Sequence, residues 1–167
     1  MHKMTESALK EAYAGESQAH MRYEIFADVA EKAGLKNTAR QFRAIAFAEK
    51  IHATNHYRAL GMIRDSSQNL QVAIDGEAYE VEEMYPVFNQ TAKFQNEKGA
   101  ELSTHYALET EKVHLQMYKE TKKAVDEKKD IELGDVYICS VCGYTMVGKQ
   151  PEKCPVCNAP GSAFVKF

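Results

Sequence analysis

Glu-Lys-Ile-His at residues 49–52 is the stretch that decides the fold, and a near copy, Glu-Lys-Val-His, follows at residues 111–114. Each copy lies in a long segment with helical periodicity, so its Glu and its His share one helix face. Four-helix bundles build paired-metal sites from two helices that carry Glu-x-x-His and two helices that each add a Glu. The sequence therefore predicts a mainly α protein with a paired-metal site among four helices.

Length and composition limit what this chain can be. It has 167 residues, 44% of them hydrophobic, and a formal charge of −3, which is enough for one ordinary domain with a small satellite. The acidic balance argues against nucleic acid as a partner. No apolar run reaches the roughly 20 residues of a membrane span, and residues 1–10 lack the apolar region of a signal peptide. We expect a soluble, cytoplasmic protein without nucleic-acid or membrane partners.

The last fifth of the chain differs in composition from the rest. Residues 134–167 hold all four cysteines and three of the four prolines. Proline and glycine favour turns over helices. We therefore predict two domains, a helical domain over residues 1–133 and a short, turn-rich domain over residues 134–167.

The hydrophobic periodicity and the turn residues predict four helices, at residues 5–33, 38–60, 77–97 and 100–128. The segment between the second and third helices, residues 62–76, is long for a bundle connection. One long crossover at this place is typical of the ferritin-like four-helix bundle. The same segment would also let two chains exchange helices, and the sequence leaves that alternative open. Pro86 should bend the third helix next to Glu83.

Several carboxylate and imidazole side chains fall on the inward faces of these helices. They are Glu16, Glu49, His52, Glu80, Glu83, Glu111 and His114. Five clustered carboxylates without a Lys or Arg would repel one another in a core, and two divalent cations would remove that repulsion. Carboxylate and imidazole ligands suit iron or manganese, and a site with open positions suits oxygen or peroxide. One Glu-x-x-His alone is common on surface helices, whereas this whole set is specific.

Three other residues near the expected site each allow two interpretations of their role. His20 and His56 lie one helical turn from Glu16 and His52, so each is either a ligand or, more commonly, a packed histidine. Tyr23 is either a proton donor near the metals or an aromatic residue of the core. An internal repeat offset by 62 residues aligns Tyr23 with Tyr85. The same offset would place Glu16 on Ala78, so the repeat is imperfect at the ligands.

The turn-rich segment carries two Cys-x-x-Cys pairs, formed by Cys139, Cys142, Cys154 and Cys157. In a reducing compartment this spacing predicts a tetrahedral four-thiolate metal site. Zinc and iron both fit such ligands. A zinc ion would only stabilise the fold of this small segment. An iron ion could be redox-active, because the neighbouring aromatic residues would shield it from water.

Taken together, these motifs resemble the rubrerythrin family over essentially the full chain. The resemblance rests on Gly15-Glu16-Ser17, both Glu-x-x-His pairs, the run Glu80-x-x-Glu83-Met-Tyr-Pro86 and the rubredoxin-like cysteine segments. It implies a non-haem di-iron site in a ferritin-like bundle and an iron centre with four cysteine ligands in the tail, where zinc is a possible substitute. Asn158 stands where the family's cysteine knuckle usually has Gly. Asn tolerates a positive φ, so we expect no lost ligand.

The resemblance also implies a role for each ligand. Glu49 and Glu111 would bridge the irons, Glu16 and Glu83 would serve one iron, and Glu80 and His114 would serve the other. Glu83 in the oxidised state and His52 in the reduced state would exchange as ligands.

The function implied by the resemblance is reduction of hydrogen peroxide to water, as part of defence against oxidative stress. Electrons from NAD(P)H would arrive through an electron-donor protein, rubredoxin or a reductase, and pass through the cysteine-bound iron. A homodimer is expected, because a tail at one end of a bundle helix of about 37 Å lies far from its own di-iron site. Two alternatives stay open: a ferritin-like oxidase that handles iron or reduces oxygen, and a non-enzymatic module stapled by zinc.

Overall fold

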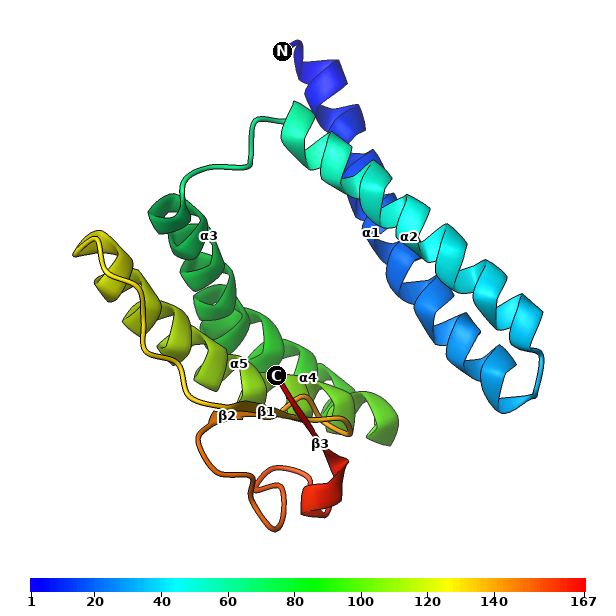
Figure 1. The fold of residues 1–167 in the computed structure, drawn as a ribbon, viewed down its shortest axis with the longest axis vertical. Coiled ribbons are helices and arrows are strands. Elements are labelled where there is room, and N and C mark those ends of the chain that lie inside the picture. The colour runs from blue at the N-terminus through cyan, green and yellow to red at the C-terminus, as the bar shows by residue number, and fades with distance from the viewer. The chain divides into compact units, whose positions relative to one another are not determined.

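The computed structural model describes every residue, Met1–Phe167, and divides into two compact units, Met1–Arg64 and Asp65–Phe167 (Figure 1). Helices make up most of the chain, and a small antiparallel sheet lies at its C-terminal end. This confirms the predicted class, mainly α with a small C-terminal β domain. None of the helices combines the length and the apolar character that crossing a membrane would require.

The first unit is a helical hairpin of α1 (Lys3–Lys32) and α2 (Lys36–Ala59). Gly34 has a φ of 77°, and the Leu35 N–H donates to the Ala30 carbonyl at 2.9 Å, so the predicted glycine stop closes α1. Because the turn is only a few residues long, the two helices lie side by side and antiparallel (Figure 1). Both predicted helices of this unit are confirmed to within two residues at each end.

The seam between α1 and α2 is made of small side chains. Every fully buried residue of the two helices is an alanine: Ala27, Ala30, Ala39, Ala46 and Ala53. Alanine lets helix axes approach closely but buries little apolar area. The hairpin therefore has no core of large side chains of its own.

The second unit contains the remaining helices. A continuous helical segment comprises α3 (Ser66–Tyr79), a π-helical segment (Glu80–Met84) and α4 (Tyr85–Phe94). Helix α5 (Lys98–Asp126) returns beside it (Figure 1).

The predicted start of the third helix at residue 77 is wrong, because the helix begins at Ser66. Asp65 caps α3 by accepting a hydrogen bond from the Gln68 N–H at 2.9 Å. The run Asp-Ser-Ser-Gln, which we interpreted as turn residues, is thus a helix start. Most of residues 62–76, predicted as a crossover, is helical, and the connection between α2 and α3 is only residues 60–65.

The bend expected near Pro86 takes the form of the π-helical segment that ends two residues before it. Proline has no N–H to donate, so the helical hydrogen bonding must change on its N-terminal side. A π-helical turn holds one more residue than an α-helical turn, and such turns are frequent at functional sites.

The C-terminal part is a three-stranded antiparallel sheet in the order β2-β1-β3, formed by β1 (Val136–Cys139), β2 (Thr145–Val147) and β3 (Phe164–Lys166). Its core contains Cys139, Cys154 and Phe164. Asn158 has the expected positive φ, 60°. The boundary expected at residue 134 falls inside the second compact unit and stays a prediction.

Candidate metal centres

The first unit brings three of the predicted ligands together. The carboxylates of Glu16 and Glu49 and the imidazole of His52 each offer a ligand atom, and these atoms lie within 4.8 Å of one another. His52 Nδ1 is 2.9 Å from a Glu49 oxygen and 3.9 Å from a Glu16 oxygen. Glu16 comes from α1 and the other two from α2, where a spacing of three residues puts them on one face. This arrangement matches half of a paired-metal site.

The second unit holds a matching group, with one change from the prediction. Glu111 and His114 of α5 meet Glu77 of α3, again with ligand atoms within 4.8 Å of one another. His114 Nδ1 lies 2.6 Å from a Glu111 oxygen. Glu77 is not among the residues that we selected from the sequence. It takes the place beside His114 that we expected Glu80 to fill.

The second group is chemically incomplete without a cation. One oxygen of Glu77 is buried and has no hydrogen-bond partner. Burial and the hydrogen bond with Glu111 raise the pKa of Glu77 to about 7. Burial also raises the pKa of Glu111. Buried acceptors packed this closely need shared protons or a metal ion between them. The donor set, two carboxylates and one imidazole, fits iron.

The two ring nitrogens of His114 have different neighbours, Glu111 at Nδ1 and Thr145 at Nε2. The Thr145 hydroxyl donates to the Gly143 carbonyl at 3.0 Å. With its one proton on that carbonyl, it accepts from the His114 Nε2–H, and the two heavy atoms lie 2.8 Å apart. Nδ1, 2.6 Å from a Glu111 oxygen, is then the nitrogen that can bind a metal beside that carboxylate. A hydrogen bond of this kind orients a metal-binding histidine.

Glu80 and Glu83 differ in their surroundings. Glu80 is half-buried beside the second group, and burial followed by the charge of Glu77 raises its pKa. Glu83 is exposed and belongs to neither carboxylate–histidine group. Within its own unit, the structure therefore does not bring Glu83 to the ligands, and Glu77 with Glu80 replaces the predicted pair one helical turn earlier.

Tyr85 is a second residue that the sequence reasoning missed as part of the site. Its pKa is raised by burial and then by the charges of Glu80, Glu111 and Glu77, so its hydroxyl feels the acidic group. The internal repeat already aligned Tyr85 with Tyr23. It could have identified Tyr85 as a site residue.

The π-helical segment explains why the repeat failed at the ligands. Tyr23 comes seven positions after Glu16, whereas Tyr85 comes eight positions after Glu77. The segment Glu80–Met84 lies inside the longer interval and absorbs the extra residue. Glu77 is thus the counterpart of Glu16, although a strict 62-residue offset points to Ala78.

The structure shows the surroundings of His20 and Tyr23, two residues of the first unit whose roles the sequence left open. His20 Nδ1–H donates to the Ala46 carbonyl at 2.8 Å, which ties α1 to α2 and supports the reading of a packed histidine. Tyr23 lies among aromatic rings, with its centroid 6.2 Å from those of Phe26 and Phe42. No hydrogen bond joins Tyr23 to a ligand carboxylate within this unit.

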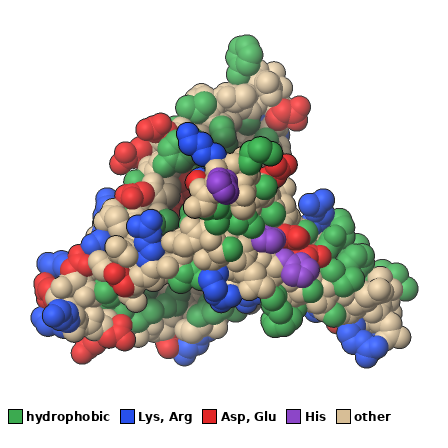
Figure 2. Space-filling view, turned by 90° about the horizontal axis from the view of Figure 1, so that it is seen from above, with side chains coloured by type: hydrophobic (Ala, Val, Ile, Leu, Met, Phe, Trp, Pro, Cys, Tyr) green, Lys and Arg blue, Asp and Glu red, His purple; other side chains and the backbone are tan.

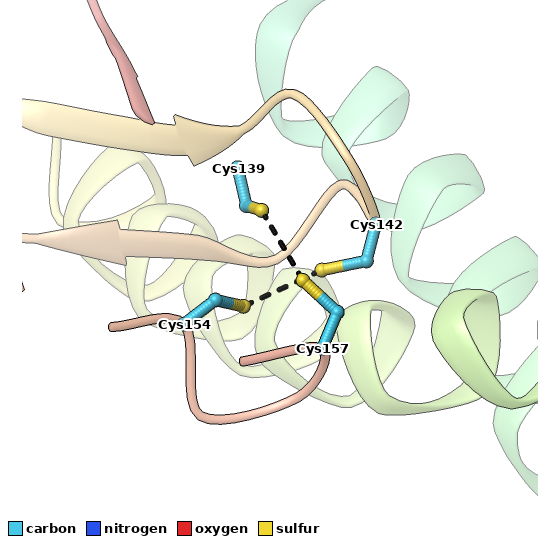
Figure 3. A group of neighbouring side chains, drawn as sticks. All are labelled: Cys139, Cys142, Cys154 and Cys157. Carbon is cyan, nitrogen blue, oxygen red and sulfur yellow. Dashed lines mark hydrogen bonds between the residues drawn. The ribbon is translucent and has the colours of Figure 1, made fainter. Parts of the chain in front are cut away.

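The four cysteines converge on one point from two loops, as Figure 3 shows. The Sγ atoms of Cys139 and Cys157 are 3.6 Å apart, and those of Cys142 and Cys154 are 3.5 Å apart. A tetrahedron with metal–sulfur bonds of about 2.3 Å has edges of about 3.8 Å. The four thiolates therefore fit a rubredoxin-type iron site, and burial raises the pKa of the Cys142 thiol in the metal-free state.

The cysteine domain packs directly on α5 of its own chain. Besides the hydrogen bond between Thr145 and His114, the Thr110 hydroxyl, which donates to the Tyr106 carbonyl at 2.9 Å, also lies 3.4 Å from the Cys142 carbonyl oxygen. A groove of about 650 Å³ between α5 and this domain is lined by Glu111, His114 and Cys142, among others. The expectation that the tail lies far from its own ligands is therefore wrong for the half of the site that α5 carries.

Comparison with known proteins agrees with this geometry. The family model described as Rubrerythrin matches residues 7–122, and the model described as Rubrerythrin, rubredoxin-like domain, matches residues 137–165. The chain is 44% identical to Rubrerythrin-2 of Clostridium acetobutylicum over 98% of its own length and 97% of that protein. It is 32% identical to nigerythrin of Nitratidesulfovibrio vulgaris, over 95% of this chain and 84% of that one.

Solved structures give the same relationship. The mixed-valence state of nigerythrin matches with a TM-score of 0.56 and 31% identity, over 98% of this chain and 86% of that one. The carboxylate–histidine bundle and the four-thiolate tail define a non-haem iron protein of the ferritin-like class. Within that class the chain belongs to the rubrerythrin family. The carboxylate and histidine groups of a di-iron centre and the cysteines of a rubredoxin-type site are all present.

Proposed function

We propose that this chain is a peroxide reductase that converts hydrogen peroxide to water with electrons delivered through its cysteine-bound iron. The observation that carries the proposal is that one chain holds both carboxylate–histidine groups and a four-thiolate site. A hydrogen bond of 2.8 Å from His114 to Thr145 connects the second carboxylate–histidine group to the domain that carries the four cysteines. A storage protein would need the carboxylates but would have no use for a thiolate iron at that place.

The two carboxylate–histidine groups act, in this proposal, as the halves of one di-iron centre. Glu16, Glu49 and His52 form one half, and Glu77, Glu111 and His114 form the other, with Glu80 beside it. Iron bound there supplies two electrons and a Lewis acid for cleavage of the O–O bond. The overall reaction consumes one peroxide, two electrons and two protons and releases two water molecules.

The chain's own residues position and protonate the substrate. Tyr85 carries its proton at neutral pH, as an ordinary tyrosine does, and burial with the nearby acidic side chains raises its pKa further, so we assign it the role of a proton donor to the centre. The Thr145 hydroxyl holds His114 in the tautomer whose Nδ1 can bind a metal. The groove beside Glu111 and His114 gives a small, polar oxidant a path to the ligands.

The partners follow from the need for an outside supply of electrons. An electron-donor protein, rubredoxin or an NAD(P)H-dependent reductase, would reduce the cysteine-bound iron. Thiolate iron that is shielded by protein on one side and reachable from solvent on the other suits this task. Cys139 and Cys154 are buried, whereas Cys142 and Cys157 are partly exposed. We also propose that the working form is a homodimer.

Steady-state kinetics test the function. Protein loaded with iron under anaerobic conditions should consume NADH in proportion to added hydrogen peroxide when a rubredoxin and its reductase are present. Cys142→Ser should abolish this turnover and should leave Fe(II) binding at the carboxylate groups intact. Net deposition of Fe(III) from excess Fe(II), without NADH-dependent turnover, would instead identify an iron-handling oxidase. Peroxide turnover that is unchanged by Cys142→Ser would remove the tail from the electron path.

A further inference from the structure

A series of hydrogen bonds leads from His114 into the cysteine domain. The His114 Nε2–H donates to the Thr145 hydroxyl, and the two heavy atoms lie 2.8 Å apart. The Thr145 hydroxyl donates in turn to the Gly143 carbonyl at 3.0 Å. Because the Gly143 carbonyl and the Tyr144 N–H belong to one peptide group, the series continues through that group to Tyr144.

The last hydrogen bond of the series reaches a metal-binding sulfur. Burial raises the pKa of the Cys142 thiol, and a hydrogen bond from the Tyr144 N–H acts against this rise, because it favours the thiolate. Cys142 is one of the four cysteines that converge in Figure 3. At the other end of the series, His114 Nδ1 lies 2.6 Å from a Glu111 oxygen. Hydrogen bonds therefore join a carboxylate–histidine group to the four-thiolate site.

The middle of this series is shielded from water. Thr145 is only 4% exposed, so water does not compete for its hydroxyl. Thr110 of α5, which is 3% exposed, packs against Gly143, where a Cβ would lie 3.9 Å from the Thr110 side chain. In such surroundings hydrogen bonds in a row polarise one another. A change of charge at His114 is therefore transmitted to the sulfur of Cys142.

We propose that these hydrogen bonds couple the two kinds of metal site, so that a cation held by Glu77, Glu111 and His114 raises the reduction potential of the cysteine-bound iron. The inference rests on the proposed metal centre and adds a control of its electron supply. A cation at Nδ1 draws charge from the imidazole and makes its Nε2–H a stronger donor. The series then ends in a stronger N–H···S bond, which favours the reduced, more negative thiolate iron.

The local hydrogen bonds matter because the surface offers no strong field of one sign in their place. Figure 2 shows acidic and basic side chains interspersed over the visible face. Exposed charges of mixed sign largely cancel, and salt screens them beyond about 10 Å. The potential of the cysteine-bound iron is therefore set mainly by the groups that touch its ligands.

The coupling is reciprocal, and it has a use. One electron from the donor protein converts Fe(III) to Fe(II) in the tail, and no bond to sulfur breaks. A chain without a cation at His114 is harder to reduce, so it draws fewer electrons that it cannot pass on. By linkage, reduction of the tail must tighten cation binding by the same factor. We expect about fivefold or more, the low end of couplings between sites, which is about 41 mV for one electron.

Spectroelectrochemistry on the full chain tests the coupling. Protein with iron only in its tail is titrated with and without Mn(II), which prefers carboxylate ligands to thiolates. The ferric-thiolate absorption reports the potential, and the electron paramagnetic resonance of Mn(II) reports its binding. Mn(II) should raise the potential of wild type by about 41 mV or more. Thr145→Ser, which keeps the hydroxyl, should show the same shift, and Thr145→Val should lose most of it at saturating Mn(II).

Thr110→Val is the matched control. It removes a hydroxyl that lies 3.4 Å from the Cys142 carbonyl oxygen but outside the series, so it should keep the wild-type shift. Equal shifts in wild type and Thr145→Val would overturn the hydrogen bonds as the link, because the charge of the cation would then act through space. Bound Mn(II) without a shift in wild type would overturn the coupling alone. Wild type that binds no Mn(II) would overturn the metal centre and the coupling with it.

Wild type also supplies a second measurement that needs no variant. Mn(II) should bind about fivefold or more tightly when the tail iron is ferrous than when it is ferric. Titrations followed by electron paramagnetic resonance, with and without prior reduction by dithionite, give the two affinities. Equal affinities would contradict the coupling, even if Thr145→Val does not fold.

Discussion

At the scale of single residues, His114 connects the two kinds of metal site. Its Nδ1 faces Glu111, and its Nε2–H is held by Thr145, three residues after Cys142. The Thr145 hydroxyl can accept from this N–H while it donates its own proton to the Gly143 carbonyl. The geometry of the imidazole is therefore set by the cysteine domain and not by α5 alone.

Replacing Thr145 with Val should weaken metal binding at His114. The substitution removes the acceptor of the Nε2–H, so the ring is no longer held in one tautomer. Losses of about 10–100-fold in affinity follow when the outer partner of a metal-binding histidine is removed. Titration of the anaerobic protein with Fe(II) measures the change, and Thr145→Ser, which keeps the hydroxyl, should restore the affinity. Equal affinity for the Val and Ser variants would contradict this role.

Glu77 and Glu83 form a second pair of residues whose roles can be separated. Glu77→Gln should weaken Fe(II) binding by more than about tenfold, because it removes a carboxylate from the donor set itself. Glu83→Gln should leave binding unchanged, since Glu83 is exposed and lies outside both groups. Iron content after gel filtration distinguishes them, and a larger loss from Glu83→Gln would restore the ligand set predicted from the sequence.

At the scale of helices and strands, the sequence predicts most of what is found. The predicted bounds of α1, α2 and α5 lie within two residues of the observed ones, because hydrophobic periodicity and the glycine stops act locally. The start of α3 was missed because Asp and Ser serve both turns and helix N-caps. Periodicity cannot separate those two uses until the helix that follows is recognised.

The metal ligands show a different limit of prediction from the sequence. Glu49, His52, Glu111, His114 and the cysteines follow from motif and spacing, because their partners are three residues away or in a matching pair. Glu77 could not be placed by a rule of 3.6 residues per turn, because a π-helical turn lies between it and Tyr85. Thr145 has no sequence pattern at all, since its role arises only when the cysteine domain packs on α5.

Gly161 is a position in the cysteine domain that has no room for a side chain. A Cβ at this residue would lie 2.4 Å from the Pro151 carbonyl oxygen, which is backbone and cannot rotate away. Gly161→Ala should therefore destabilise the domain by about 1–3 kcal/mol, the usual cost of overpacking. Gly134→Ala, whose Cβ would meet Val147 at an ordinary 3.5 Å, should cost little.

Loss of the ferric-thiolate absorption during denaturation with guanidinium measures this effect. The helical circular dichroism, recorded in the same samples, shows whether the change is confined to the cysteine domain. Two variants with the same midpoint would show that residues 150–152 can move away from the added methyl group.

At the scale of the whole molecule, the connection between α2 and α3 covers only residues 60–65, and its length limits how far apart the ends of the two hairpins can lie. Inserting about twelve Gly and Ser residues between Ile63 and Arg64 would give the connection ample reach for the crossover, at about 3.3 Å per residue. The two hairpins of one chain would then meet at a millimolar effective concentration, far above that of a second chain.

The lengthened chain should accordingly sediment as a monomer, and it should keep its carboxylate-bound iron. A lengthened chain that still sediments as a dimer would show that something other than the short connection holds the two copies together.

The short connection between α2 and α3 also has a consequence for the cell that makes this protein. The homodimer proposed above would form at a rate that depends on the square of the chain concentration, so a newly made chain waits for a partner. At low expression most copies would stay monomeric, and a modest rise in synthesis would bring a disproportionate gain in dimer. The amount of working protein would then rise more steeply than the supply of chains.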